Sequence, residues 1–217
     1  MILPHQPLQS LPHASLADRL VSAPHVHDPT RAERERTALA AVAAADPSLA
    51  PLRVLLGQAP IASLLDGVFS GSPFLTRLIA RYPGDLQRCL CSAPEQLAAM
   101  LSGELQAACV VAPNRAQVMH ALRRYKSQIA LLTALADLGG VWPVLAVTRT
   151  LAEAADAAVR AALGHVFAMA QDRGDWLDAG PDPAACSGYF VLAMGKHGAF
   201  ELNYSSDIDL IVFYDPA

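Results

Sequence analysis

The sequence predicts an α+β protein that is mostly α-helical, with helices first and strands last. Hydrophobic residues make up 53% of the 217 residues, charged residues only 17% and aromatic residues 6%, and alanine recurs throughout. This composition is typical of helices packed through small side chains. Short runs rich in aromatic and β-branched residues appear only near the end, at 189–195 and 207–214, and these predict the first strands of a sheet.

Three regions follow from the distribution of prolines, glycines and apolar repeats. Residues 1–30 contain scattered prolines and are expected to form a mobile leader. Residues 31–185 are expected to form a helical region that ends in a loop rich in glycine, proline and aspartate. Residues 186–217 are expected to begin a second domain. The predicted helices are 31–45, 60–69, 73–82, 94–102, 114–136 and 144–171, with Ser72 as the N-cap of the third.

Charge and cysteine content exclude several classes of protein. A net charge of -4 and a pI near 5.9 provide no basic field for a nucleic-acid backbone. No apolar stretch reaches membrane-spanning length, and no signal peptide is apparent. The spacing of the cysteines forms neither a C-x-x-C pair nor a zinc motif, which predicts free thiols in a cytoplasmic protein. The charge and the short apolar stretches predict no nucleic-acid or membrane partner. These cysteines are Cys89, Cys91, Cys109 and Cys186.

Two aspartates open the last apolar run. On a strand, side chains two positions apart share a face, so Asp207 and Asp209 are expected to lie together while Ile208 and Leu210 anchor the other side. Paired carboxylates repel each other unless a cation lies beside them, and Mg²⁺ is the cation that suits a few carboxylate oxygens and a phosphate. A D-x-D pair alone is weak, because a solvated strand edge that resists aggregation has the same pattern.

A glycine turn lies just upstream. Gly195, Lys196 and Gly198 follow the first predicted strand, where backbone N–H groups and one lysine would hold phosphate oxygens; the alternative is an ordinary turn. The turn is not a P-loop, because Phe190 and His197 occupy positions where that motif requires glycine and serine or threonine.

The longer string "GKHGAFELNYSSDIDLIVFY" resembles the signature of the bifunctional glutamine synthetase adenylyltransferase/adenylyl-removing family, within the DNA polymerase β-like nucleotidyltransferase superfamily. The similarity extends upstream through "GVFSGSPFLTRLIARYP" and "ALRRYKSQIALLTALADLGG", and so covers roughly residues 31–217. The resemblance implies that residues 186–217 begin a nucleotidyltransferase domain, here truncated. Family members are much longer and carry two such halves.

The resemblance also implies an activity and its residues. The N-terminal half would remove AMP from a tyrosine of glutamine synthetase, with phosphate attacking to give ADP, whereas the other half would use ATP; the PII signal protein is an implied partner. Asp207 and Asp209 would be catalytic and hold Mg²⁺, and Gly195, Lys196 and Gly198 would steady phosphate. Ser205 and Ser206 would contact phosphate, fix an aspartate or merely form the turn.

Several features leave alternatives open. The sequence departs from the family pattern at His197, Ala199 and Phe200, and the superfamily site uses a third carboxylate from a later strand, which Asp215 is too far along its own strand to replace. The chain is therefore expected to be an N-terminal piece with little activity of its own. The rival interpretations are another polymerase β-like transferase and a non-catalytic helical interaction module.

Overall fold

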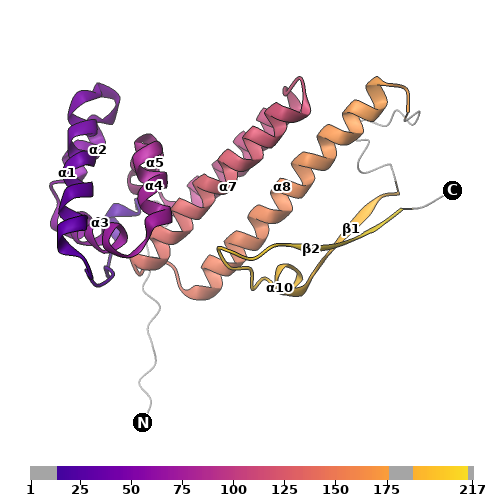
Figure 1. Ribbon diagram of the computed structural model, residues 1–217. Helices are drawn as coiled ribbons and strands as arrows, with labels where there is room; N and C mark the ends of the chain where they lie inside the picture. Colours follow the sequence, from indigo (N-terminus) through magenta and orange to yellow (C-terminus); the bar gives the residue numbers. More distant parts are fainter. Residues whose placement is uncertain (1–13, 176–187, 215–217) are drawn as a thin grey trace, which may run out of the picture. The chain divides into compact units, whose positions relative to one another are not determined.

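The computed structural model describes residues 14–175 and 188–214 (Figure 1). Within them the chain is mostly helical with one two-stranded sheet, which confirms the predicted mostly-α, α+β class. The helices are α1 (Pro29–Ala45), α2 (Ala50–Leu55), α3 (Ala59–Gly71), α4 (Pro73–Arg81), α5 (Pro83–Cys91), α6 (Pro94–Val110), α7 (Arg115–Leu138), α8 (Val144–Asp172) and α10 (Gly195–Gly198), and the strands are β1 (Phe190–Met194) and β2 (Asp209–Phe213). Residues 176–187 of the predicted loop at 171–188, residues 1–13 of the predicted leader, Cys186 and Asp215 lie outside the described residues.

Prolines explain both the agreements and the omissions among the helices. The six predicted helices are present, although the one expected at 94–102 continues to Val110. Helices α2 and α5 were not predicted, and each has a proline in its first turn. Proline has no N–H to lose there and its fixed φ suits a helix start, so a proline at these positions begins a helix.

The chain divides into two compact units. The first comprises residues up to Leu97 together with Leu138–Val141, and the second comprises Ala98–Asp137 and Trp142 onward. In the first unit α1 packs against α3. The apolar face of α3 is fully buried, and its largest members are Ile61, Leu64, Leu65, Val68 and Phe69.

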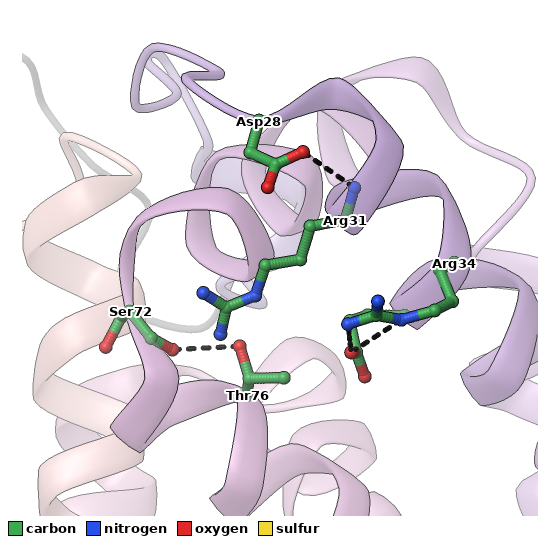
Figure 2. Close-up of polar contacts among 6 residues, drawn as sticks. Asp28, Arg31, Arg34, Ser72 and Thr76 are labelled. Carbon is green, nitrogen blue, oxygen red and sulfur yellow. Dashed lines mark hydrogen bonds and ion pairs between the residues drawn. The ribbon is translucent and has the colours of Figure 1, made fainter.

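Side-chain caps fix the helix starts in the first unit (Figure 2). Asp28 accepts a hydrogen bond from the Arg31 amide at 2.9 Å and so caps α1. The predicted Ser72 cap of α4 is confirmed, because its side chain accepts from the Leu75 amide at 3.2 Å. The Thr76 hydroxyl donates to the Ser72 carbonyl at 2.8 Å. These bonds satisfy amides that the helix itself leaves unpaired.

Residues 14–28 are anchored within the first unit. Leu16 is fully buried and its amide donates to the Ser92 carbonyl at 2.8 Å. Arg19 forms an ion pair of 2.7 Å with Glu95. Pro24 lies against Gly67 of α3 so closely that a Cβ at Gly67 would come within 2.5 Å of the Pro24 carbonyl oxygen. The proline content of this segment, which predicted a leader without regular structure, did not indicate these contacts.

The second unit contains most of α7, all of α8, and the sheet with α10. Apolar residues recur along α7 at helical spacing, and most of them are buried, namely Val118, Tyr125, Ile129, Leu132 and Leu135, whereas Leu122 is half-buried. Thr133 on the same helix is fully buried and its hydroxyl donates to the Ile129 carbonyl at 2.7 Å. Figure 1 shows the sheet and α10 beside α8.

The two strands are antiparallel, with Phe190 opposite Phe213 and Met194 opposite Asp209. Directly opposed residues share a face. One face, with Val191, Ala193 and Leu210, lines a cavity beside α8. Asp209 is therefore on the other face, together with Met194 and the stacked rings of Phe190 and Phe213, whose centroids are 5.0 Å apart.

The structure describes the length and composition of the helices and the state of three of the four cysteines. No single described helix is both long and apolar enough to cross a membrane; only α1 together with Pro47–Leu55, bent by 115°, reaches that length and composition. Cys89, Cys91 and Cys109 are free thiols. Burial raises the pKa of each of these thiols, which keeps them protonated and poorly reactive.

The contact between Pro24 and α3 predicts a difference between two glycines of that helix. Gly67→Ala is expected to lower the free energy of unfolding by about 1–3 kcal/mol, because the added methyl group overlaps Pro24. Gly71→Ala is the matched control, since no heavy atom lies within 4 Å of its added carbon. Urea unfolding followed by circular dichroism measures both; equal stabilities would contradict the docking of residues 14–28 on α3.

Candidate functional site

The glycine turn and one aspartate meet where the two strands pair. α10 begins at Gly195, directly after β1, and Asp209 is the first residue of β2, opposite Met194. Gly195 has a φ of +53°, in the left-handed region that favours glycine. A Cβ on Gly195 would lie 3.1 Å from Oδ2 of Asp209, closer than ordinary van der Waals contact. The fold thus brings Asp209 against the backbone of the predicted phosphate turn.

Gly198 is required by an equally close approach. A Cβ at this position would overlap the carbonyl oxygen of Ala193 in β1. Beyond it the turn is closed by amides of Phe200 and Glu201, which donate to the carbonyls of His197 at 3.1 Å and Lys196 at 2.8 Å. This is the hydrogen-bond pattern of a Schellman motif, with Phe200 at a φ of +58° where glycine is usual.

The Lys196 side chain is exposed. It forms no hydrogen bond or ion pair with another residue of 14–175 or 188–214. An unengaged ammonium beside a glycine turn suits a phosphate group as a point charge.

Asp207 and Asp209 are both exposed. Neither carboxylate makes a hydrogen bond or ion pair within the described part of the chain. The observed strand contains Asp209 but begins after Asp207. Strand alternation therefore does not fix the direction of the Asp207 side chain, and a shared face for the two carboxylates stays a prediction. Ile208 and Leu210, expected to anchor the strand, are 37% and 38% exposed.

The residues before the aspartates form a turn held by Asn203. Oδ1 of Asn203 accepts from the Ser205 amide at 3.1 Å and from its hydroxyl at 3.3 Å. The Ser206 amide donates to the Asn203 carbonyl at 3.3 Å. The Ser205 hydroxyl thus already donates within the turn, which is the turn-forming role weighed from sequence, whereas the Ser206 hydroxyl has no such bond among the described residues.

Tyr204 connects this turn to α7. Its hydroxyl donates to Oδ2 of Asp137 in a long hydrogen bond of 3.4 Å. Burial of the phenol, together with the neighbouring Asp137 charge, raises the pKa of Tyr204. The phenol therefore remains a hydrogen-bond donor at all ordinary pH values.

Two residues of α8, Asp156 and Arg149, contact the glycine turn, and neither was identified as a site residue from the sequence. His197 is 3% exposed, and its Nε2 lies 2.9 Å from Oδ1 of Asp156 on α8. The guanidinium of Arg149, also on α8, lies 4.9 Å from the centre of the Phe200 ring. Helical periodicity placed both residues on α8, but no local pattern pairs them with a turn so much later in the sequence.

The carboxylate of Asp209 could serve as a ligand of a hard divalent cation. It is unengaged and lies against the glycine turn, where the missing side chain of Gly195 leaves the backbone open toward it. The carboxylate of Asp207, two residues earlier, is also unengaged. Oxygen ligands of this kind suit Mg²⁺, which commonly takes one or two carboxylates and completes its shell with water and phosphate. Among the described residues no cluster of three or more histidine, cysteine or acidic side chains forms a ligand set.

Comparison with known proteins assigns the chain to a family. The family model described as glutamate-ammonia ligase adenylyltransferase matches residues 62–217. Proteins named bifunctional glutamine synthetase adenylyltransferase/adenylyl-removing enzyme are similar to this chain. The one from Bradyrhizobium diazoefficiens is 44% identical over 204 residues, which cover 93% of this chain and 20% of the relative. The one from Xanthobacter autotrophicus is 48% identical over 169 residues, covering 76% and 17%.

The chain spans about a fifth of the length of these curated relatives. No solved structure matches it. The family model nevertheless covers most of the chain, including the glycine turn and both aspartates. The chain belongs to the glutamate-ammonia ligase adenylyltransferase family.

Proposed function

We propose that this chain is part of an enzyme that controls glutamine synthetase by adding and removing AMP, and that its site serves the removal. The observation that carries the proposal is the approach of Asp209 to Gly195, which places a carboxylate beside a lysine-bearing turn. A carboxylate and a phosphate repel each other, so this arrangement is favourable when a divalent cation lies between them.

Each residue then has a distinct role. Asp207 and Asp209 hold the cation with their unengaged oxygens. Lys196 and the backbone of Gly195 and Gly198 hold phosphate oxygens. Ser206 offers a free hydroxyl to the same group, whereas Ser205 shapes the turn through Asn203.

The proposed reaction is a phosphorolysis. An oxygen of inorganic phosphate attacks the phosphorus of adenylyl-tyrosine, the bond from that phosphorus to the tyrosine oxygen breaks, and the tyrosine oxygen takes up a proton. The products are ADP and unmodified tyrosine. Bound Mg²⁺ would supply charge neutralisation at the phosphorus under attack. The chain's part is to place phosphate and exclude unproductive orientations, which is where most catalysis of phosphoryl transfer originates.

The assignment to the removing half rests on the helices. The helical segments that precede the turn resemble the N-terminal region of the family, whose glycine turn and aspartates follow such a region. Glutamine synthetase, the PII signal protein and the nucleotides ATP and ADP are the partners that this assignment entails, in the cytoplasm. The names of the relatives, which join adenylyltransferase and adenylyl-removing activities to glutamine synthetase, are consistent with it.

An activity assay tests the assignment. Adenylylated glutamine synthetase is incubated with Mg²⁺, inorganic phosphate and either this chain or a protein of the relatives' length that contains it, and ADP is measured. The longer protein is expected to form ADP, and the chain alone little or none, because a third carboxylate is expected elsewhere. ADP formation that persists in the longer protein with Asp207→Asn would refute the role of this site.

Removal of one carboxylate charge is expected to weaken ligand binding. Asp207→Asn and Asp209→Asn should each weaken Mg²⁺-dependent binding of ADP to the chain by more than about tenfold, because even indirect partners of a metal often contribute that much. Titration calorimetry measures the affinity. Glu153→Gln, an exposed carboxylate on α8, is the control and should leave binding unchanged; equal effects at all three positions would indicate only a general loss of charge.

The close approach of Asp209 predicts a different effect at two left-handed glycines. Gly195→Ala and Gly174→Ala both place alanine at positive φ, +53° and +74°, at a cost of about 1–2 kcal/mol. Only the former adds a carbon beside Asp209, since nothing lies within 4 Å at Gly174. Gly195→Ala should therefore weaken ADP and phosphate binding, whereas Gly174→Ala should change stability alone. Unaltered binding in Gly195→Ala would exclude a ligand between the turn and Asp209.

A further inference from the structure

We propose that Asp156 on α8 is a positioning residue that sets the geometry of the Gly195–Gly198 turn through His197. The first argument is burial. The His197 side chain is 3% exposed, and Asp156 Oδ1, at 2.9 Å from Nε2, is its polar partner. A carboxylate accepts and cannot donate when ionised, so Nε2 carries the proton in this contact.

The second argument is that the other ring nitrogen has no hydrogen-bond partner that could replace Asp156. Nδ1 of His197 is buried and has no hydrogen-bond partner within the described residues. Without Asp156 the imidazole would therefore have no partner among the described residues, which is unfavourable for a buried polar group. Both residues line a cavity beside α8, so a water molecule there would be the remaining partner for Nε2, and it would hold the ring less firmly than a carboxylate fixed to α8.

The third argument concerns what else joins the turn to α8. Next to this contact, the face of the sheet toward α8 borders a cavity of about 320 Å³, whose apolar walls include Val159, Leu163, Val191 and Leu210. Apolar packing there is thus incomplete. The Asp156 contact and the guanidinium of Arg149, 4.9 Å from the centre of the Phe200 ring, are two side-chain connections between α8 and residues 195–200.

The consequence concerns ligand placement. His197 lies between Lys196 and Gly198, so a movement of its ring displaces the backbone proposed to hold phosphate. Movement of α8 would be transmitted to that backbone by the same contact.

The inference deepens the proposed function, and its test separates the two. In Asp156→Ala, amides 196–201 are expected to exchange hydrogen faster, the Nε2–H signal of the His197 ring should be lost, and phosphate affinity should fall about tenfold, which equals about 1.4 kcal/mol. Exchange is measured on the intact chain by NMR, and affinity by titration with inorganic phosphate and Mg²⁺.

Two variants of the same helix make the result specific. Asp156→Asn keeps an oxygen that accepts from Nε2, so it should restore slow exchange, the ring signal and phosphate affinity. Arg160→Ala removes the side chain 4.0 Å from Asp156 on its other side and should leave all three unchanged. Faster exchange and weaker binding in Arg160→Ala comparable to those in Asp156→Ala would overturn the proposal, because the effect would then belong to α8 in general.

The remaining outcomes are equally decisive. Unchanged exchange of residues 196–201 in a folded Asp156→Ala variant overturns the positioning role. If the wild-type chain binds no phosphate but exchange still depends on Asp156, the positioning role holds and the phosphate role of the turn, part of the proposed function, is wrong. If phosphate binds with equal affinity to wild type and Asp156→Ala, the contact does not position the ligand.

Discussion

The need of a buried imidazole for a partner is the constraint on which the candidate site depends. His197 lies inside the segment that joins the two strands, and its ring points at a helix rather than at solvent. Burial of such a group is favourable only with its hydrogen bond in place. The bond to Asp156 therefore determines where the turn can lie relative to α8, and through the turn it determines the position of Lys196.

Close backbone approach is the second determinant of the site. Gly198 allows the turn to fold back onto the Ala193 carbonyl, and Gly195 allows Asp209 to lie against the turn. A side chain at either position would separate the components that the proposed chemistry requires together. The two glycines thus have steric roles that do not depend on ligand binding. The absence of a side chain at each position is what allows the turn and Asp209 to lie together.

The two faces of the sheet carry different residues and have different neighbours. Val191, Ala193 and Leu210 are directed toward α8, whereas Asp209 lies on the opposite face with Met194 and the stacked rings of Phe190 and Phe213. Asp209 is exposed on that face, so its carboxylate is accessible to a cation from solvent. Family membership rests on sequence similarity, whereas the proposed cation site rests on where Asp209 lies against the backbone of Gly195.

The class of fold, six of the helices and both strands could be predicted from the sequence, whereas the site residues remain a prediction. Periodicity reports burial of one helix face, as for Val118, Tyr125 and Ile129 of α7, and the glycine and aspartate pattern reports a turn and a strand start, because these signals are local. Helices α2 and α5 were missed because proline is ambiguous locally between a break and a start.

Tertiary structure alone decided the contacts between distant residues. No local pattern in the sequence links the members of these pairs, which are Asp156 with His197, Arg149 with Phe200, Pro24 with Gly67, and Asp209 with Gly195. Their pairing depends on how helices and strands pack, which is set by the sum of many weak contacts rather than by any short motif.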